Sequence, residues 1–188
     1  REQVSPAELA DRTARLMALE LDREGVELRC QLDDDLPTIH GDPAQLEVVL
    51  LNLVRNAMQA LEPAPAARWI RLRVFATAEG VCFEVADPGR PIPDEARERL
   101  FDSFFTTRRG GTGTGLFLSR RIAERHGGRI RVEPNTGGGT CFLVSLPRSD
   151  RRSSTDAVSA KAILVVDSDH TTRQIKLWML EEFGLTVD

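Results

Sequence analysis

Apolar residues recur at helical spacing in two segments near the start of the chain. A capping box that begins at Ser5, with proline at the first helical position, predicts a helix from about residue 6 to residue 21. Asp42 opens a second helix, which Pro63 ends because proline cannot continue one. The apolar positions of this second helix, over 43–61, have the spacing of a buried face: Leu46, Val49, Leu50, Leu53, Ala57, Ala60 and Leu61.

Other segments alternate between apolar and polar residues, as half-buried strands do. Segments 26–30, 70–74 and 81–85 show this pattern, and the last two are typical of an antiparallel pair with one face on a core. Segments 129–133 and 140–146 form a further pair across a glycine-rich turn at 135–139. This mixture predicts an α/β fold: a two-layer sandwich of a mixed, largely antiparallel sheet with helices on one face.

The pattern changes after residue 148. Residues 149–160 are polar, rich in Ser and Arg and without an apolar period, which indicates a linker. Residues 162–166 form a continuous apolar run, as in a buried parallel strand, and a helical pattern and a second strand follow. We therefore expect one domain over 1–148, a linker over 149–160, and a truncated β-α-β unit over 161–188 that is too short to bury its own core.

Composition limits the class of protein. The chain has 188 residues, of which 41% are hydrophobic, and a formal charge of −4, which argues against nonspecific nucleic-acid binding. No apolar run reaches the length of a membrane span and the N-terminus is unlike a signal peptide, so we expect this segment to be cytoplasmic. The cysteines and histidines lack metal-ligand spacing, and we expect the thiols to be buried and reduced: Cys30, Cys82 and Cys141, with His40, His126 and His170.

The segment 101–115 carries the strongest chemical signal. Four glycines fall within positions 110–115, and a helical pattern follows at Leu116. Glycines that open a helix expose backbone N–H groups to an anion, and the helix N-terminus adds partial positive charge, so a phosphate is the expected ligand. A flexible loop before a helix is the alternative. A P-loop is excluded because no Lys-Ser/Thr pair follows Gly115, and a dinucleotide fingerprint because no strand precedes the glycines.

Two other groups of polar residues suggest ligand contacts. Asn52, Asn56 and Gln59 share one face of the second helix, and amide oxygens suit Mg²⁺; a solvated helix face is the alternative. Asp87 follows directly on a strand, where its carboxylate can accept a hydrogen bond from an exocyclic amine. Gly89 would let a flat ring approach the backbone, although an ordinary turn has the same composition.

The order of these motifs over residues 5–148 resembles the catalytic ATP-binding domain of histidine kinases. The resemblance implies a Bergerat-type fold that binds ATP with Mg²⁺ beneath a mobile lid shaped by Phe101, Phe104 and Phe105. It implies that Asn56, with Asn52 nearby, holds the metal, and that Asp87 binds the adenine amine with support from Thr140. The implied nucleotide-contacting residues are Asn52, Asn56, Asp87, Gly89, Thr107, Arg108, Gly111, Thr112, Gly113, Thr114, Gly115, Leu116 and Thr140.

The resemblance also implies a reaction and its partners. The γ-phosphoryl group of ATP would pass to a histidine on an upstream dimerisation hairpin of the same full-length protein, which would be a homodimer. A receiver domain or response regulator would act next. ATP hydrolases of this fold, such as gyrase B, carry a Glu where this chain has Asn52, and an amide cannot act as a general base, so transfer is favoured over hydrolysis.

Several positions depart from the family pattern. Pro91 replaces the second glycine of the first glycine box, and Gln59 stands where many members have a basic residue, for which Arg55 and Arg108 could compensate. No histidine of the chain lies in a phosphoacceptor motif. Residues 161–188 resemble the start of a receiver domain, with Ser168 at a usually acidic position. A catalytically weakened pseudokinase, acting as a nucleotide-binding regulatory module, is the alternative function.

Overall fold

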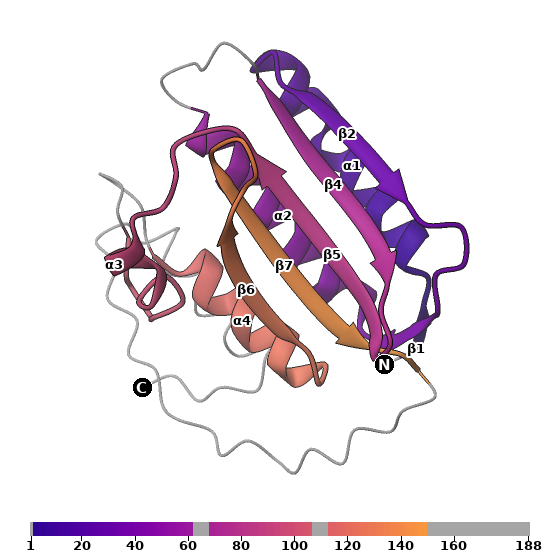
Figure 1. Cartoon of the computed structure of the whole chain (residues 1–188). Coiled ribbons are helices and arrows are strands. Elements are labelled where there is room, and N and C mark those ends of the chain that lie inside the picture. Colours follow the sequence, from indigo (N-terminus) through magenta and orange to yellow (C-terminus); the bar gives the residue numbers. More distant parts are fainter. Residues whose placement is uncertain (1, 62–67, 107–112, 150–188) are drawn as a thin grey trace, which may run out of the picture. The chain divides into compact units, whose positions relative to one another are not determined.

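The computed structural model describes residues 2–61, 68–106 and 113–149, and Figure 1 shows their two layers, a sheet with helices behind it. In chain order the elements are β1 (Glu2–Val4), α1 (Pro6–Arg23), β2 (Glu27–Leu32), β3 (Ile39–Gly41), α2 (Pro43–Ala60), β4 (Trp69–Ala76), β5 (Gly80–Asp87), α3 (Asp94–Arg97), α4 (Gly115–Arg125), β6 (Arg129–Pro134) and β7 (Thr140–Pro147). Apart from Ser149, the predicted linker and the unit over 161–188 lie outside the described residues.

The larger sheet has the strand order β2-β4-β5-β7-β6. Its β2–β4 pair is parallel and its other three pairs are antiparallel, which confirms the predicted mixed, largely antiparallel sheet with helices on one face. Two features were not predicted: the parallel pairing of β2, and a small antiparallel sheet of β1 and β3. Both join segments that are distant along the chain.

Side chains at both predicted helix starts make the expected caps. Ser5 Oγ accepts a hydrogen bond from the backbone N–H of Glu8 (3.3 Å) at the start of α1. At the start of α2, Asp42 Oδ1 accepts from the N–H groups of Ala44 (2.9 Å) and Gln45 (3.2 Å). These N–H groups have no partner within their own helix, so the caps specify where each helix begins.

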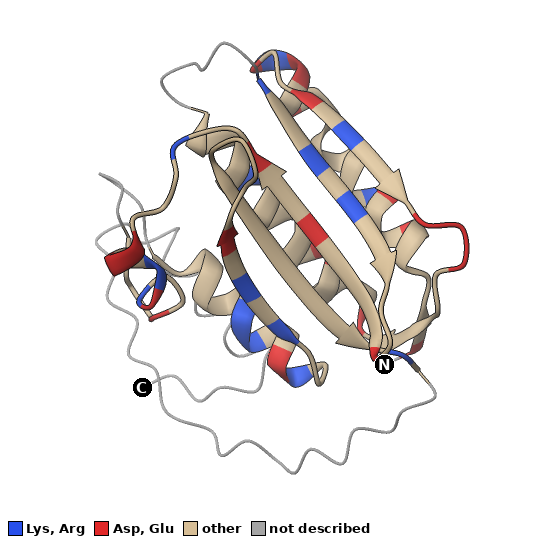
Figure 2. Cartoon of the chain, in the orientation of Figure 1, with Lys and Arg blue, Asp and Glu red and all other residues tan. Residues whose placement is uncertain are grey.

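The core lies between the sheet and helices α1, α2 and α4. Alternate residues of β4, β5 and β7 point into it and are almost fully buried: Ile70, Leu72, Val74, Val81, Phe83, Val85, Phe142, Val144 and Leu146. The intervening residues lie on the uncovered face, and Figure 2 shows charged residues at several positions along these strands. On this face the guanidinium groups of Arg29 and Arg71 lie 5.2 and 5.8 Å from the centre of the Trp69 ring. Cation–π contact of this kind shields the apolar ring from water.

The thiols differ from expectation at one position. Cys82 and Cys141 are buried, as predicted, and burial raises the pKa of Cys141 to about 12, so this thiol stays protonated at neutral pH. Cys30 is exposed, so the prediction of a buried thiol is wrong there; its strand, β2, lies at the edge of the sheet. Among the described residues, no cluster of three or more His, Cys, Asp or Glu side chains could bind a metal. No helix of the described part is long and apolar enough to cross a membrane.

A buried histidine joins the end of α4 to the start of α2. His126 Nε2 accepts a hydrogen bond from the N–H of Asp42 (3.0 Å), and its Nδ1 donates to the carbonyl of Ile122 (2.8 Å). The ring fits against the chain only because residue 41 is glycine, since a Cβ there would lie 2.7 Å from His126 Cδ2. The Nε2 bond therefore joins α4 to α2, and the Nδ1 bond fixes the ring against the last turn of α4.

We predict that His126→Leu lowers the free energy of unfolding by about 1–3 kcal/mol, because it removes the acceptor of a partly buried N–H group. Urea denaturation followed by circular dichroism measures this loss. His40→Leu is the matched control, since His40 is exposed on β3 and should change stability little. Equal stability of the two variants would contradict the role given to His126.

Candidate nucleotide-binding site

One row of residues on α2 connects the two predicted ends of the site. Asn52, Asn56 and Ala60 follow one another at intervals of four, so they lie along one side of the helix over about 12 Å. Asn52 contacts the start of α4, and the carbonyl of Ala60 contacts the turn after β5. Asn56, which is half-buried, lies between these two contacts along the helix.

The side chain of Asn52 is oriented by α4. Its Nδ2 donates to the carbonyl of Gly115 (3.0 Å) and to Ser119 Oγ (3.3 Å), and Ser119 Oγ in turn donates to the same carbonyl (3.0 Å). The amide nitrogen is thus engaged by α4, which leaves Oδ1 as the atom that can act as a ligand. A Cβ at Gly115 would lie 3.2 Å from Oδ1, so glycine here also keeps space around this oxygen.

The described end of the glycine loop is packed against the aromatic segment that precedes it. Gly113 has φ +64°, and a Cβ on it would lie 2.4 Å from the carbonyl carbon of Phe104. Phe104 also has a positive φ (64°) and is 47% exposed, whereas Phe101 is buried. Of the three predicted lid residues, therefore, Phe101 anchors the segment in the core and Phe104 faces solvent.

Helix α4 begins at Gly115, immediately after this loop. The N–H groups of its first turn, which include that of Leu116, have no carbonyl partner within the helix. Thr114 occupies the N-cap without a side-chain cap, and Leu116 is half-buried. Four other residues predicted to contact the nucleotide lie outside the described residues: Thr107, Arg108, Gly111 and Thr112.

Near the other end of the row, Asp87 and Thr140 are neighbours on adjacent strands. Asp87 is the last residue of β5 and pairs directly with Thr140, the first residue of β7. Both are buried, at 1% and 3% exposure. Asp87 Oδ1 accepts from the N–H of Gly89 (2.8 Å), and Thr140 Oγ1 donates to the carbonyl of Arg90 (3.5 Å). The carboxylate and hydroxyl therefore lie on adjacent strands at one edge of the core.

Gly89 makes a packing contact that the sequence did not predict. A Cβ on Gly89 would lie 2.4 Å from the carbonyl oxygen of Ala60, and the N–H of Arg90 donates to that same oxygen (3.0 Å). The glycine thus lets the turn after β5 pack against the end of α2. Gln59 and Pro91, which depart from the family pattern, are both exposed.

Arg55, one of the two residues expected to compensate for Gln59, contacts α1 in this structure. Its Nε donates to Glu20 Oε2 on α1 (3.3 Å), so its guanidinium group faces α1. Sequence reasoning also missed three residues that hold the site together: Ser119, His126 and Asn135. Only Asn135 had a recognisable signal, because asparagine before a glycine run is typical of a tight turn.

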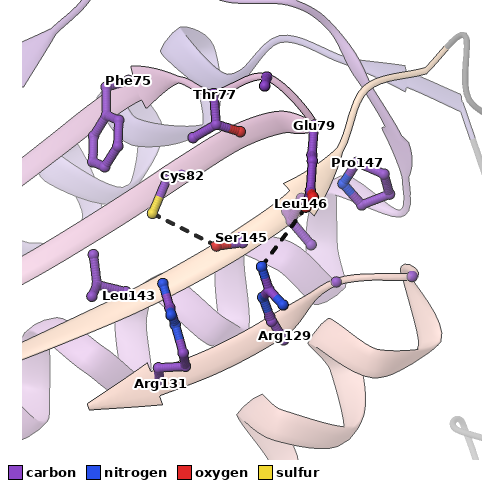
Figure 3. Close-up of a pocket in the computed structure, with 13 residues that line it drawn as sticks. Phe75, Thr77, Glu79, Cys82, Arg129, Arg131, Leu143, Ser145, Leu146 and Pro147 are labelled. Atoms are coloured by element: carbon purple, nitrogen blue, oxygen red, sulfur yellow. Dashed lines mark hydrogen bonds and ion pairs between the residues drawn. The ribbon is translucent and has the colours of Figure 1, made fainter. Parts of the chain in front are cut away.

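A separate hollow lies on the uncovered face of the sheet, and Figure 3 shows its lining side chains. It has a volume of about 440 Å³ and is lined by residues that include Phe75, Cys82, Leu143, Ser145 and Arg131. None of the predicted nucleotide-contacting residues lines it. The hollow is therefore distinct from the candidate site, whose residues Asp87 and Thr140 belong to the face that the helices cover.

A mixed sheet with helices on one face, and polar residues gathered where α2 meets two loops, defines the class of two-layer ATP-binding domains. Residues 41–150 match the family of histidine kinase-, DNA gyrase B- and HSP90-like ATPases. The chain belongs to this family, and it contains an ATP-binding catalytic domain of the kind found in two-component histidine kinases.

Individual proteins support this assignment. The chain is 37% identical over 127 residues to the sensor protein FixL of Bradyrhizobium diazoefficiens, a match that covers 68% of this chain and 25% of FixL. The solved catalytic domain of the histidine kinase ThkA is 28% identical with a TM-score of 0.70, covering 78% of this chain and 97% of that one. Full-length ShkA, solved with AMPPNP, is 26% identical with a TM-score of 0.69, and the match covers 98% of this chain and 39% of ShkA. The chain thus spans about a quarter of FixL's length.

We predict that Asn52→Leu lowers the free energy of unfolding by about 1–2 kcal/mol, since two hydrogen bonds between α2 and α4 are lost. Hydrogen exchange should locate the effect in the first turn of α4, at the N–H of Leu118, which donates to the carbonyl of Thr114. Gln59→Leu on the same helix serves as the control, because Gln59 is exposed. Unchanged protection of Leu118 would show that Asn52 does not hold α4.

Proposed function

We propose that this chain binds Mg²⁺·ATP along α2, with adenine at the Asp87–Thr140 end and the phosphates at the Gly113–Gly115 end. The observation that carries this proposal is the row of Asn52, Asn56 and Ala60, whose two ends contact the two loops. The separation of these ends, about 12 Å, suits an extended nucleotide. Further support comes from ShkA, whose structure contains AMPPNP, an ATP analogue.

The residues present fit these ligands chemically. The buried carboxylate of Asp87 accepts hydrogen bonds, so it would accept from the amine of adenine, whereas the carbonyl oxygen of guanine would place two acceptors together. Asn56 and Asn52 would offer amide oxygens to Mg²⁺, a cation that prefers oxygen ligands. The bound cation would neutralise charge on the phosphates. The N–H groups at the start of α4 would face the same anionic group.

We further propose that the domain transfers the γ-phosphoryl group to a histidine on a dimerisation hairpin of the same full-length protein. Phosphoryl transfer depends mainly on positioning and charge neutralisation, so this domain needs no nucleophile of its own. Asn52 supports transfer over hydrolysis, because its nitrogen is held by α4 and an amide does not take a proton from water. ThkA is named as a histidine kinase, so this comparison does not support the pseudokinase alternative.

The wider setting is part of the same proposal. The full-length protein would be a homodimer that passes the phosphoryl group to a receiver domain or response regulator, and this segment would be cytoplasmic. Residues 161–188 would be the start of such a receiver domain.

We predict that Asn56→Ala weakens Mg²⁺·ATP binding about tenfold or more, because one ligand contact to a charged group is lost. Isothermal titration calorimetry with and without Mg²⁺ measures this change. The fold should persist, since Asn56 is only half-buried and lies beside the apolar positions of α2. Gln59→Ala is the matched control one turn further along. Equal affinity of folded Asn56→Ala and wild type would remove Asn56 from the site.

We predict that the dimerisation hairpin acquires acid-labile radioactive phosphate when it is incubated with the wild-type chain and radiolabelled ATP. The Asn56→Ala variant should reduce this labelling about tenfold or more, because it binds Mg²⁺·ATP more weakly. Gln59→Ala should label the hairpin like wild type. Rapid phosphate release without labelled hairpin would instead identify a hydrolase. If the chain binds nucleotide but neither labels the hairpin nor releases phosphate rapidly, it is a nucleotide-binding module, and the proposed transfer is overturned.

A further inference from the structure

The turn between β6 and β7 holds the main chain of Asp87 through a buried asparagine. Asn135 is 8% exposed, and its Nδ2 donates to the carbonyl of Asp87 and to that of Gly138, each at 3.1 Å. Two backbone bonds close the turn: the N–H of Asn135 donates to the carbonyl of Gly139 (3.2 Å), and the N–H of Gly138 donates to the carbonyl of Asn135 (3.0 Å). The amide of Asn135 thus links this turn to the end of β5.

The same turn approaches Asp87 at a second point. Gly139 has φ +92°, and a Cβ on it would lie 2.0 Å from the carbonyl oxygen of Asp87 and 2.8 Å from Pro88 Cα. Only glycine permits this approach, both because of its φ and because of the space. Asn135 and Gly139 therefore hold the Asp87 peptide unit from one side, while the end of α2 packs against Gly89 from the other.

Asp87 needs such support because the strand ladder stops there. The pair Asp87–Thr140 is the last of the β5–β7 register, and the chain turns away at Pro88, which has no N–H to donate. The direction of the Asp87 carboxylate depends on the orientation of its own peptide unit and on the bond from Gly89 N–H to Oδ1. A shift of the Asp87 carbonyl would change both.

We propose that Asn135 is a positioning residue that aims the carboxylate of Asp87 and thereby sets selectivity for adenine over guanine. This inference rests on the proposed function, in which Asp87 binds the adenine amine. Asn135 touches the backbone of Asp87 and acts on the nucleotide through Asp87. A residue that merely formed the turn would affect both nucleotides equally when replaced.

The test is Asn135→Ala in the full chain, with Thr136→Ala as the matched control in the same turn, where Thr136 is exposed. Affinities for ATP and GTP are measured by calorimetry. We expect the preference of wild type for ATP to fall about fivefold in Asn135→Ala, as for the loss of one orienting hydrogen bond, and to be unchanged in Thr136→Ala. An unchanged ratio, or an equal loss for both nucleotides, would overturn the inference.

A second readout needs no nucleotide. Hydrogen exchange of Gly89 N–H, which donates to Asp87 Oδ1, should accelerate in Asn135→Ala, whereas exchange of Phe83 and Val85 within β5 should not. If wild type binds neither nucleotide, the proposed function fails, and unchanged Gly89 exchange would still refute the positioning of Asp87. Asn135→Ser provides a second variant that keeps turn preference but has a side chain too short to span to Asp87, and it should reproduce both effects.

Discussion

Helix α2 is the element on which the rest of the described structure depends. One side of it is buried against the sheet, with Leu53, Val54 and Ala57 fully enclosed. The adjacent side carries the row that touches both loops of the candidate site. Because a helix is stiff, its burial in the core sets the distance between the glycine loop at Gly115 and the turn after Asp87. The packing of this one helix therefore sets the spacing of the two described ends of the candidate site.

Buried and half-buried polar side chains hold the ends of elements in place. Asn52, His126 and Asn135 each bond to backbone atoms of a segment distant in sequence, at the start of α4, the start of α2 and the end of β5. At such points the regular hydrogen bonding of helix or strand stops, and a backbone group left without a partner in the interior is costly. The side chains that satisfy these groups also fix the directions in which the loops of the site leave the core.

The two faces of the sheet have separate roles. The covered face provides the core and, at its edge, Asp87 and Thr140. The uncovered face is polar, and arginines lie over its half-buried aromatic rings: Arg29 and Arg71 at Trp69, and Arg73 at Phe75. Ion pairs such as Arg71–Glu84 (2.9 Å) accompany these contacts. This arrangement lets a sheet with helices on one side expose its other side to water without a large bare apolar surface.

Local sequence by itself determined most of the elements and where they begin. The caps at Ser5 and Asp42, the alternation along β4 and β5, and the glycines between β6 and β7 act over a few residues, so their effects can be predicted without a fold. The order of motifs along the chain was likewise enough to indicate the family.

Only the tertiary structure decided how those elements meet. Three contacts join segments far apart in sequence: the parallel pairing of β2 with β4, the packing of Gly89 on Ala60, and the bond from Asn135 to Asp87. The exposure of Cys30 follows from the place of β2 at the edge of the sheet. No local pattern specifies such contacts, because they depend on which backbone groups remain without partners once the core has packed. That is why the elements and the candidate site residues could be predicted from the chain, whereas the contacts between distant segments could not.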